Sequence, residues 1–169
     1  MGPWGREILT TLARTPQAQV AAICDKYPAS VKRAAVIAAE ATAQDDYLRV
    51  LQDKEIRAVI VSTPSHRHRE VAVAALEAGK HVYCEAPLAT TLNDARAIAV
   101  AARKASPRLH FQTGLQGRSD PLRHLVASFL KAGTAGKPAL ARGQWHRKQS
   151  WRFAAPTPER EQDINWRLD

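Results

Sequence analysis

Apolar residues in this chain gather into short runs that are separated by longer segments of mixed polarity. Mainly apolar runs of four to six residues occupy residues 20–24 (VAAIC), 57–62 (RAVIVS), 81–84 (HVYC) and 109–113 (LHFQT). Apolar runs of this length fit strands that are buried on both faces, as in parallel sheets covered by helices. We therefore predict four strands at these positions.

The segments between the runs have the spacing of helices. One apolar stripe repeats every four residues near the start (Trp4, Ile8, Leu12), and another spans Val71, Ala74, Ala75 and Ala78. Start and stop signals such as Pro28, Ser65, Gly79, the capping box at Thr91 and Asp120-Pro121 bound the segments. The predicted helices cover residues 4–12, 28–43, 47–53, 65–78, 95–105 and 121–132.

Alternation of strands and helices predicts an α/β fold with a parallel sheet. The pattern changes from Pro138 onward. Residues 138–153 are strand-like but polar, and residues 154–169 have a loop-like composition, so we expect a new unit to begin in this region.

Composition excludes some classes of function. The 169 residues are 45% hydrophobic and 24% charged, with a net charge of +9, yet the basic residues are spread along the chain. Binding to a phosphate backbone usually needs a clustered basic stripe, and no apolar run approaches the roughly 18 residues that cross a membrane. We expect neither nucleic acid nor a membrane as a partner. Cys24 and Cys84 do not form a Cys-x-x-Cys pair, which favours a reduced, cytoplasmic setting without a metal site.

The first residues contain half of a known loop. Gly2-x-x-Gly5 matches the second half of Gly-x-Gly-x-x-Gly, in which glycines let the backbone approach a pyrophosphate at a helix N-terminus. Asp25 follows Gly5 by 20 residues and ends the first predicted strand. An acidic residue at this spacing binds the hydroxyls of an adenosine ribose. The alternative is that the glycines form an ordinary turn and that Asp25 merely ends a strand.

Polar side chains also follow the next two strands. STPSHRH comes after residues 57–62, and CEAP after residues 81–84. Ligands of open α/β sheets bind beyond the carboxyl ends of the strands, so these segments are candidate ligand loops. For His66 and His68 the alternative is a place in the solvated first turn of a helix.

The stretch of residues 58–98 resembles the signature region of the glucose–fructose oxidoreductase, inositol dehydrogenase and MocA (Gfo/Idh/MocA) family. Its motifs are similar to the family's Thr-Pro-Asn-x-x-His, Ala-Leu-x-Ala-Gly-Lys-His-Val and Glu-Lys-Pro-Leu-Ala. The matching residues are Thr63, Pro64 and His68, then Ala75, Leu76, Ala78 to Val82, and finally Glu85, Pro87, Leu88 and Ala89. Arg118 and Pro121 resemble the family's Arg-x-x-Pro, and the closing NWRLD resembles a segment shortly before its catalytic stretch.

The resemblance implies a Rossmann-type doubly wound sheet and an oxidoreductase that transfers a hydride between NAD and a sugar, cyclitol or related polyol. NADP stays an alternative, because Lys26 and Arg33 lie near Asp25 in the sequence. The parent protein is expected to be a homo-oligomer. The implied cofactor-binding residues are Gly2, Pro3, Trp4, Gly5, Asp25, Lys26, Ser62, Thr63, Pro64, His68, Glu85, Ala86 and Arg118.

The chain departs from the family pattern in three ways. Ser65 replaces the asparagine of the first motif, and serine is also a good N-cap. Ala86 replaces the lysine of Glu-Lys-Pro, whose ammonium can position a hydroxyl or help its proton to leave. The family's catalytic stretch lies downstream of NWRLD, so no catalytic residue is assigned, and Glu85 is the nearest candidate.

Comparison with the family predicts a chain truncated at both ends. Residues 1–118 would be the Rossmann domain without its first strand, and residues 119–169 the start of a C-terminal α/β domain for substrate and oligomer contacts. The first strand is central in the order 3-2-1-4-5-6, so its absence would leave strands 20–24 and 57–62 with unpaired edges and a chain unstable on its own. An export signal ahead of residue 1 stays an alternative to the cytoplasmic location.

Two other functions stay open at this point. One is a Rossmann module that binds a nucleotide without catalysis, and the other is a relative that uses NAD transiently to cleave glycosides. Ala86 motivates both, since alanine cannot perform the chemistry of the motif lysine.

Overall fold

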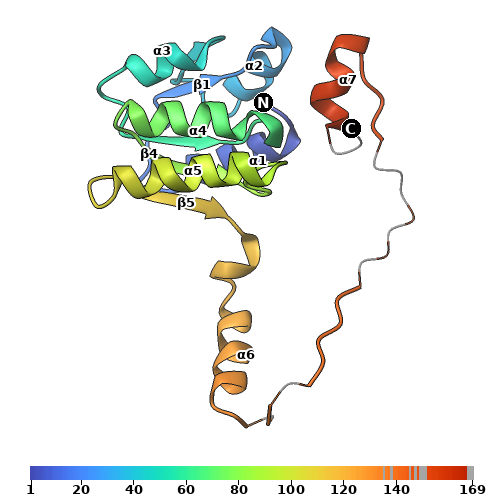
Figure 1. Cartoon of the computed structure of the whole chain (residues 1–169). Coiled ribbons are helices and arrows are strands. Elements are labelled where there is room, and N and C mark those ends of the chain that lie inside the picture. The colour runs from blue at the N-terminus through green and yellow to red at the C-terminus, as the bar shows by residue number, and fades with distance from the viewer. Residues whose placement is uncertain (135, 138, 145, 147, 149–151, 167–169) are drawn as a thin grey trace. The chain divides into compact units, whose positions relative to one another are not determined.

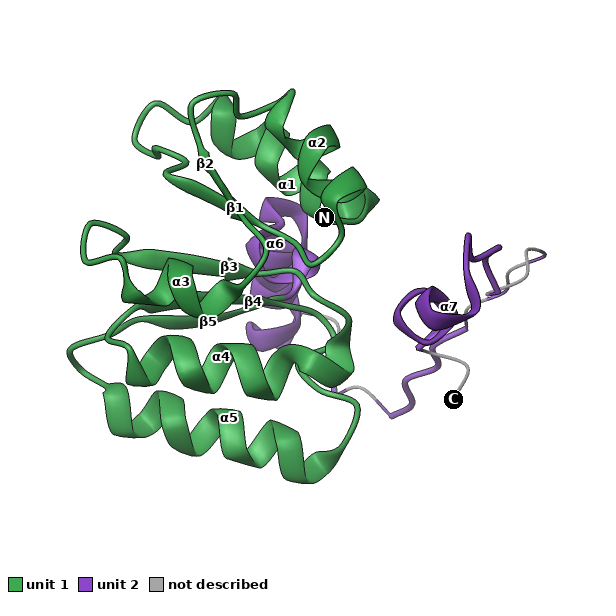
Figure 2. Cartoon of the chain, turned by 90° about the horizontal axis from the view of Figure 1, so that it is seen from above, with its two compact units in different colours: residues 1–114 green, residues 115–169 purple. Residues whose placement is uncertain are grey.

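The computed structural model describes residues 1–134, 136–137, 139–144, 146, 148 and 152–166. The chain divides into two compact units, Met1–Gly114 and Leu115–Asp169 (Figures 1 and 2).

The first unit alternates helices and strands along the chain. The elements are α1 (Pro3–Ala13), β1 (Ala22–Cys24), α2 (Pro28–Ala35), β2 (Thr42–Gln44), α3 (Tyr47–Gln52), β3 (Ala58–Val61), a 3-10 turn η1 (Ser65–Arg67), α4 (His68–Glu77), β4 (His81–Glu85), α5 (Leu92–Ala105) and β5 (Phe111–Gly114). The strands form two parallel ladders, β1-β2 and β3-β4-β5. This confirms the predicted α/β class with parallel strands.

The register of the larger ladder separates a core face from an opposite face. Val61 pairs with Cys84, and Ile60 pairs with Tyr83 one residue earlier. Val61 and Cys84 belong to the main core, where they pack with Val71, Ala72, Ala75 and Leu76 of α4. Figure 2 shows α4 and α5 side by side along these strands. A second core forms where Leu9 of α1 meets Ile23 and Ala34.

Local signals set several of the helix ends. The Thr91 hydroxyl accepts the amide of Asp94 at 3.1 Å and donates to its carboxylate at 2.8 Å, which starts α5 as the capping box predicts. Gly79 follows α4 with a φ of 77°, a left-handed conformation that favours glycine. Asp46 caps α3 by accepting the amide of Leu48.

The predicted helix over residues 28–43 is wrong in its second half. α2 ends at Ala35, and Thr42–Gln44 form β2, which pairs with β1 from Ala22↔Thr42 onward. The alanine-rich sequence favours a helix, but pairing with β1 satisfies backbone donors and acceptors that the edge of β1 would otherwise leave open.

The predicted apolar stripe of α1 is also corrected. Trp4 is 53% exposed, whereas Gly5 and Leu9 are buried. The buried face of α1 is therefore rotated by one residue from the predicted one, and Gly5 on this face lies beside Ser62, directly after β3.

The second unit contains η2 (Gln116–Ser119), α6 (Pro121–Lys131) and α7 (Pro158–Asn165). α7 contradicts the expected loop at residues 154–169. It starts with Pro158 at its first position and has two glutamates in its first turn, both favourable at a helix N-terminus. The expected strand over residues 138–153 is not found among its described residues, and the rest of that segment lies outside them.

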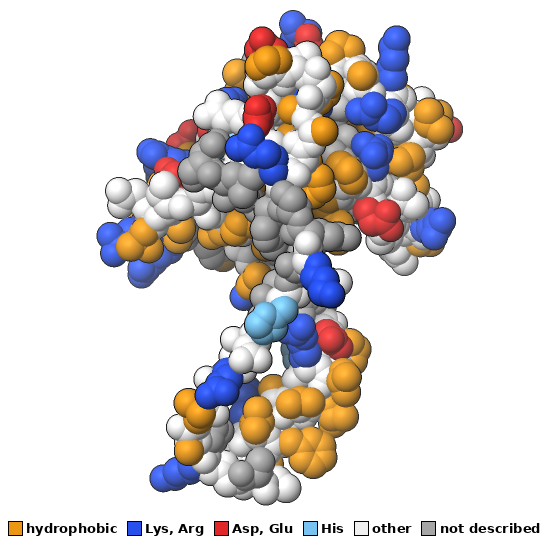
Figure 3. Space-filling view, turned by 90° about the vertical axis from the view of Figure 1, so that its right-hand side faces the viewer, with side chains coloured by type: hydrophobic (Ala, Val, Ile, Leu, Met, Phe, Trp, Pro, Cys, Tyr) orange, Lys and Arg blue, Asp and Glu red, His pale blue; other side chains and the backbone are white. Residues whose placement is uncertain are grey.

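The apolar face predicted for residues 121–132 forms on α6. Its five members are about half exposed: Leu122, Leu125, Val126, Phe129 and Leu130. In Figure 3 hydrophobic side chains gather over the part of the chain that holds α6. None of the helices in the described part of the chain combines the length and apolar character needed to cross a bilayer.

Candidate functional site

The opening turn leads directly into α1. Gly2 is the N-cap residue in an extended conformation, Pro3 is at the first helical position, and the first turn carries no acidic side chain. The amides of a helix's first turn have no partner within the helix, so they can bind an anion. A Cβ built on Gly2 would meet no atom within 4 Å. The backbone at Gly2 therefore faces open space.

The opening turn lies against the ends of two strands that belong to different ladders. A Cβ on Gly5 would lie 3.4 Å from Ser62 Oγ, directly after β3. The ammonium group of Met1 forms an ion pair with Asp25, directly after β1. The Asp25 carboxylate also accepts the amide of Tyr27 at 2.8 Å. The predicted residues Gly5, Asp25 and Ser62 therefore lie together, as the sequence-based hypothesis requires.

We call the strand ends at Asp25, Ser62, Glu85 and Gly114 the carboxyl edge.

Lys26, next to Asp25, is exposed, and its Nζ lies 5.0 Å from the centroid of the Tyr27 ring. A cation at that distance over a ring face is attracted to it. Lys26 thus lies beside Asp25 with its ammonium over an aromatic ring.

His68 connects the two predicted ligand loops. Its Nε2 lies 2.9 Å from the carbonyl oxygen of Thr63, and its Nδ1 lies 3.0 Å from that of Pro87 and 3.3 Å from that of Leu88. The side chain is only 1% exposed. The solvated first-turn alternative is therefore wrong for His68, whereas His66 is exposed. His68 serves as a link that fixes the Thr63–Pro64 loop to the Pro87–Leu88 loop.

Glu85 ends β4 and is 9% exposed, whereas Ala86 after it is exposed. Burial raises the pKa of Tyr83, and the nearby Glu85 carboxylate acts in the same direction. Gly114, opposite Glu85 on β5, lies against both side chains. Tyr83 and Gly114 were not among the predicted site residues, although the two-residue repeat of a strand places Tyr83 on the same face as Glu85.

The two cysteines have no features of a reactive site. Burial raises the pKa of the Cys84 thiol to about 12, and the nearby Glu85 charge acts in the same direction. The pKa of Cys24 is also raised, first by burial and then by Asp46 and Asp45. Thiols shifted in this direction are protonated at neutral pH and therefore poor nucleophiles and metal ligands. No group of three or more metal-ligating side chains is found among the described residues.

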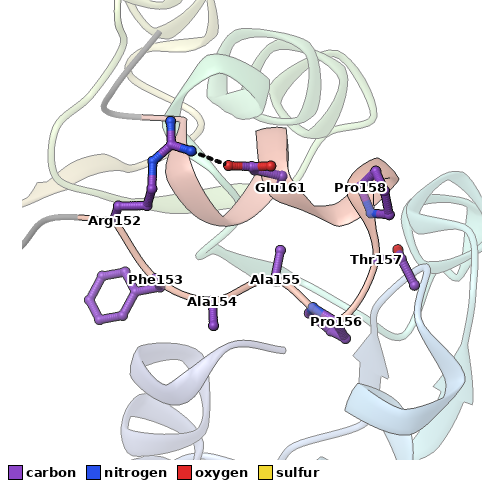
Figure 4. Close-up of a pocket in the computed structure, with 8 residues that line it drawn as sticks. All are labelled: Arg152, Phe153, Ala154, Ala155, Pro156, Thr157, Pro158 and Glu161. Carbon is purple, nitrogen blue, oxygen red and sulfur yellow. Dashed lines mark hydrogen bonds and ion pairs between the residues drawn. The ribbon is translucent and has the colours of Figure 1, made fainter.

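Arg118 lies in η2, within the unit Leu115–Asp169. That unit also contains a hollow between residues 152–158 and the first turn of α7 (Figure 4). Arg152 and Glu161 form an ion pair of 2.7 Å at its rim. The hollow is lined by none of the predicted site residues.

The carboxyl edge offers the groups that a dinucleotide needs. The N-terminus of α1 supplies amides and space for a phosphate, Asp25 supplies an acceptor for sugar hydroxyls, and Glu85 supplies a second carboxylate at the end of β4. Dinucleotides bind across such an edge in open parallel sheets. The residues present therefore fit this class of ligand.

Comparisons with known proteins agree with this geometry. A sequence model described as an oxidoreductase family with an NAD-binding Rossmann fold (GFO_IDH_MocA) matches residues 1–113. An inositol 2-dehydrogenase from Salmonella typhimurium is 33% identical over 146 residues, which are 85% of this chain and 43% of the relative.

Two solved structures are also similar. The scyllo-inositol dehydrogenase of Lactobacillus casei, with bound NAD(H) and scyllo-inositol, has a TM-score of 0.74 and 25% identity over 80% of this chain and 40% of its own. A 3-ketoreductase from Actinomadura kijaniata, in complex with NADP, has a TM-score of 0.65 and 29% identity over 74% and 38%. The chain thus spans less than half the length of the proteins it matches.

Proposed function

Since the chain belongs to the Gfo/Idh/MocA family of oxidoreductases with an NAD-binding Rossmann fold, we propose that its residues 1–114 bind the dinucleotide of an enzyme that oxidises or reduces sugars, cyclitols or related polyols. When bound, the nicotinamide would accept or donate the hydride. The proposal extends to residues 115–169 as the beginning of the substrate domain, and to a cytoplasmic, homo-oligomeric parent protein.

The observation that carries the proposal is the position of the opening turn. Gly5 lies against Ser62, and the Met1 ammonium contacts Asp25, so the helix N-terminus lies between two strand ends. In the proposed complex the amides of α1 bind the pyrophosphate. Asp25 accepts hydrogen bonds from the adenosine ribose, and the Thr63–Pro64 loop lines the dinucleotide.

The charge of Asp25 favours NAD over NADP. A carboxylate beside the ribose would repel a 2′-phosphate, whereas it accepts hydrogen bonds from free hydroxyls. Lys26 and Arg33 carry opposing charge in the same region of the sequence, and the Arg33 guanidinium lies 3.4 Å from the Ser30 hydroxyl. We therefore propose NAD as the cofactor, with weaker binding of NADP.

Titration of the whole 169-residue chain with NADH and with NADPH, followed by nicotinamide fluorescence, tests the proposal. We expect saturable binding of NADH, and about a tenfold weaker binding in Asp25→Asn, with NADPH affected less. Asp53→Asn is the matched control, because Asp53 also accepts the amide two residues ahead, at 2.9 Å, but lies after α3. A folded chain that binds neither dinucleotide would contradict the proposal, and tighter binding of NADPH would contradict the choice of NAD.

Ala86 supports a second candidate, a module that binds the nucleotide without catalysis. Its exposed methyl group offers no proton donor where the family motif has an ammonium group. An Ala86→Lys variant distinguishes the candidates in a chain extended to the length of its relatives. Hydride transfer to a polyol in the extended wild type would refute the non-catalytic candidate, and transfer only in the variant would support it.

A further inference from the structure

Arg6 is the fourth residue of α1, and its side chain lies at the opening turn. The side chain is partly buried, and its Nη1 donates a hydrogen bond to the carbonyl oxygen of Met1 at 3.0 Å. The guanidinium therefore reaches back to the residue that precedes the N-cap Gly2. Because the acceptor is a backbone carbonyl, this contact does not depend on which side chain stands at position 1.

The charge of Arg6 is unfavourable for the helix that carries it. A helix N-terminus has a partial positive charge, which repels a cation and attracts an anion. The first turn of α1 has no acidic side chain that would offset this charge. The charge of Arg6 thus does not stabilise α1, whereas an anion at the opening turn would be attracted by the helix and by the side chain together.

The N-terminus of α1 also offers one amide fewer than that of an ordinary helix. The amides of the N-cap residue and of the first three helical residues have no partner within a helix, and Pro3 occupies the first helical position without an N–H group. The Arg6 amide already donates to the Gly2 carbonyl at 3.1 Å. A guanidinium has five N–H groups, of which the bond to Met1 uses one, so the Arg6 side chain can supply donors in place of the missing amide.

We propose that Arg6 is a phosphate-binding residue, whose guanidinium is held beside the opening turn by the Met1 carbonyl and donates hydrogen bonds to the pyrophosphate of the dinucleotide. The inference rests on the proposed function and adds to it a residue outside the predicted cofactor-binding set. Hydrogen bonds from arginine to phosphate are charge-assisted, and they are stronger than those between neutral groups. Arg6 therefore contributes to the affinity for the part of the cofactor that carries its negative charge.

Titration of the whole 169-residue chain with NADH tests this role. Arg6→Gln should raise the Kd about tenfold or more, because hydrogen bonds to a charged group are lost. Arg6→Lys keeps the charge without the planar fork of donors, so its Kd should lie between those of Arg6→Gln and the wild type. Arg14→Gln is the matched control, since it removes the same charge at the C-cap of the same helix, where Arg14 is exposed. The control should leave the Kd unchanged.

Two further measurements distinguish a phosphate contact from a role in folding. Raising the NaCl concentration from about 50 to about 500 mM screens exposed charges, so the wild type and the control should lose more of their affinity for NADH than Arg6→Gln does. The Tm of unliganded Arg6→Gln should stay within about 4 °C of the wild type. Removal of a cation from the positive end of α1 offsets the lost contact with Met1.

The outcomes separate this inference from the proposed function. If the wild type binds NADH and Arg6→Gln has the same Kd, or a raised Kd with the salt dependence of the wild type, the role of Arg6 is overturned and the dinucleotide site stands. A Tm of unliganded Arg6→Gln lowered by more than about 4 °C would assign Arg6 to the folding of the turn and would also overturn it. Failure of the folded wild type to bind NADH would overturn the proposed function, and the role of Arg6 with it.

Discussion

Replacing His68 by alanine removes the side chain that joins the two ligand loops, and we expect it to cost both stability and cofactor affinity. The imidazole is 1% exposed, and its two nitrogens face carbonyl oxygens of Thr63 at 2.9 Å and of Pro87 at 3.0 Å. Without the ring, the carbonyl groups of Thr63 and Pro87 lose these contacts.

The expected loss follows from the hydrogen bond that the ring donates. An imidazole with one N–H can donate to only one of the two carbonyl oxygens, and a buried polar group left without its partner costs about 1–3 kcal/mol. A domain has about 5–15 kcal/mol of stability in total. His68→Ala should therefore lower the urea midpoint strongly, and His68→Gln, which keeps one donor, should lie between the variant and the wild type.

Urea unfolding followed by circular dichroism measures the effect. His66→Ala, two residues away and exposed, is the control and should change the free energy of unfolding by less than about 0.5 kcal/mol. NADH titration of the same variants should show a raised Kd for His68→Gln, because both loops line the proposed cofactor site. A His68→Ala loss below about 1 kcal/mol would refute the interpretation of His68 as a link between the loops.

Three further outcomes are expected. Gly5→Ala should leave the Tm unchanged or raised, because alanine favours helices and its Cβ fits at 3.4 Å or more from its neighbours. The same variant should bind NADH about tenfold or more weakly. Unchanged NADH binding would contradict a pyrophosphate at this turn. The hydrogen bond with the Thr91 hydroxyl is the main cause that lowers the pKa of Asp94 below 3.8. Asp94→Asn should therefore be less stable than the wild type above that pH, and in urea unfolding the difference should vanish as the pH falls through the lowered pKa. A difference in stability that persists at about pH 2 would count against this prediction. A thiol reagent at about pH 8 should label Cys24 well before Cys84, whose pKa is raised to about 12, and equal labelling rates in native protein would argue against the described burial.

The fold class was predictable because its signal is local. The mainly apolar runs VAAIC and RAVIVS have about the length of a buried strand. The predicted bounds of β1 and β3 therefore agree with the observed bounds to within a few residues. The strand β2 was not, because Thr42 and Ala43 are exposed and the segment has neither an apolar run nor an alternating pattern. Its existence depends on β1, which supplies its hydrogen-bond partners.

The candidate site divides in the same way. Asp25 and the loop glycines follow from spacing, and the structure brings them together. The burial of His68 depends on its contact with the Pro87–Leu88 loop, which begins 19 residues further along the chain, and no local pattern encodes that contact. The pair of Tyr83 with Glu85 needed the register with β5, since only that register identifies Gly114 as the residue opposite.

The division of the strands into two ladders has a consequence for hydrogen exchange. In a parallel ladder alternate residues direct their amides toward the partner strand, so the registers of β1 with β2 and of β3 with β4 place the amides of Ala22, Cys24, Ala58 and Ile60 on the sides away from their partners. The intervening amides are bonded within the ladders. Deuterium uptake resolved by residue should therefore alternate along both strands, fast and slow in turn, and a ligand or polypeptide that enters between the two ladders would be recorded as loss of that alternation.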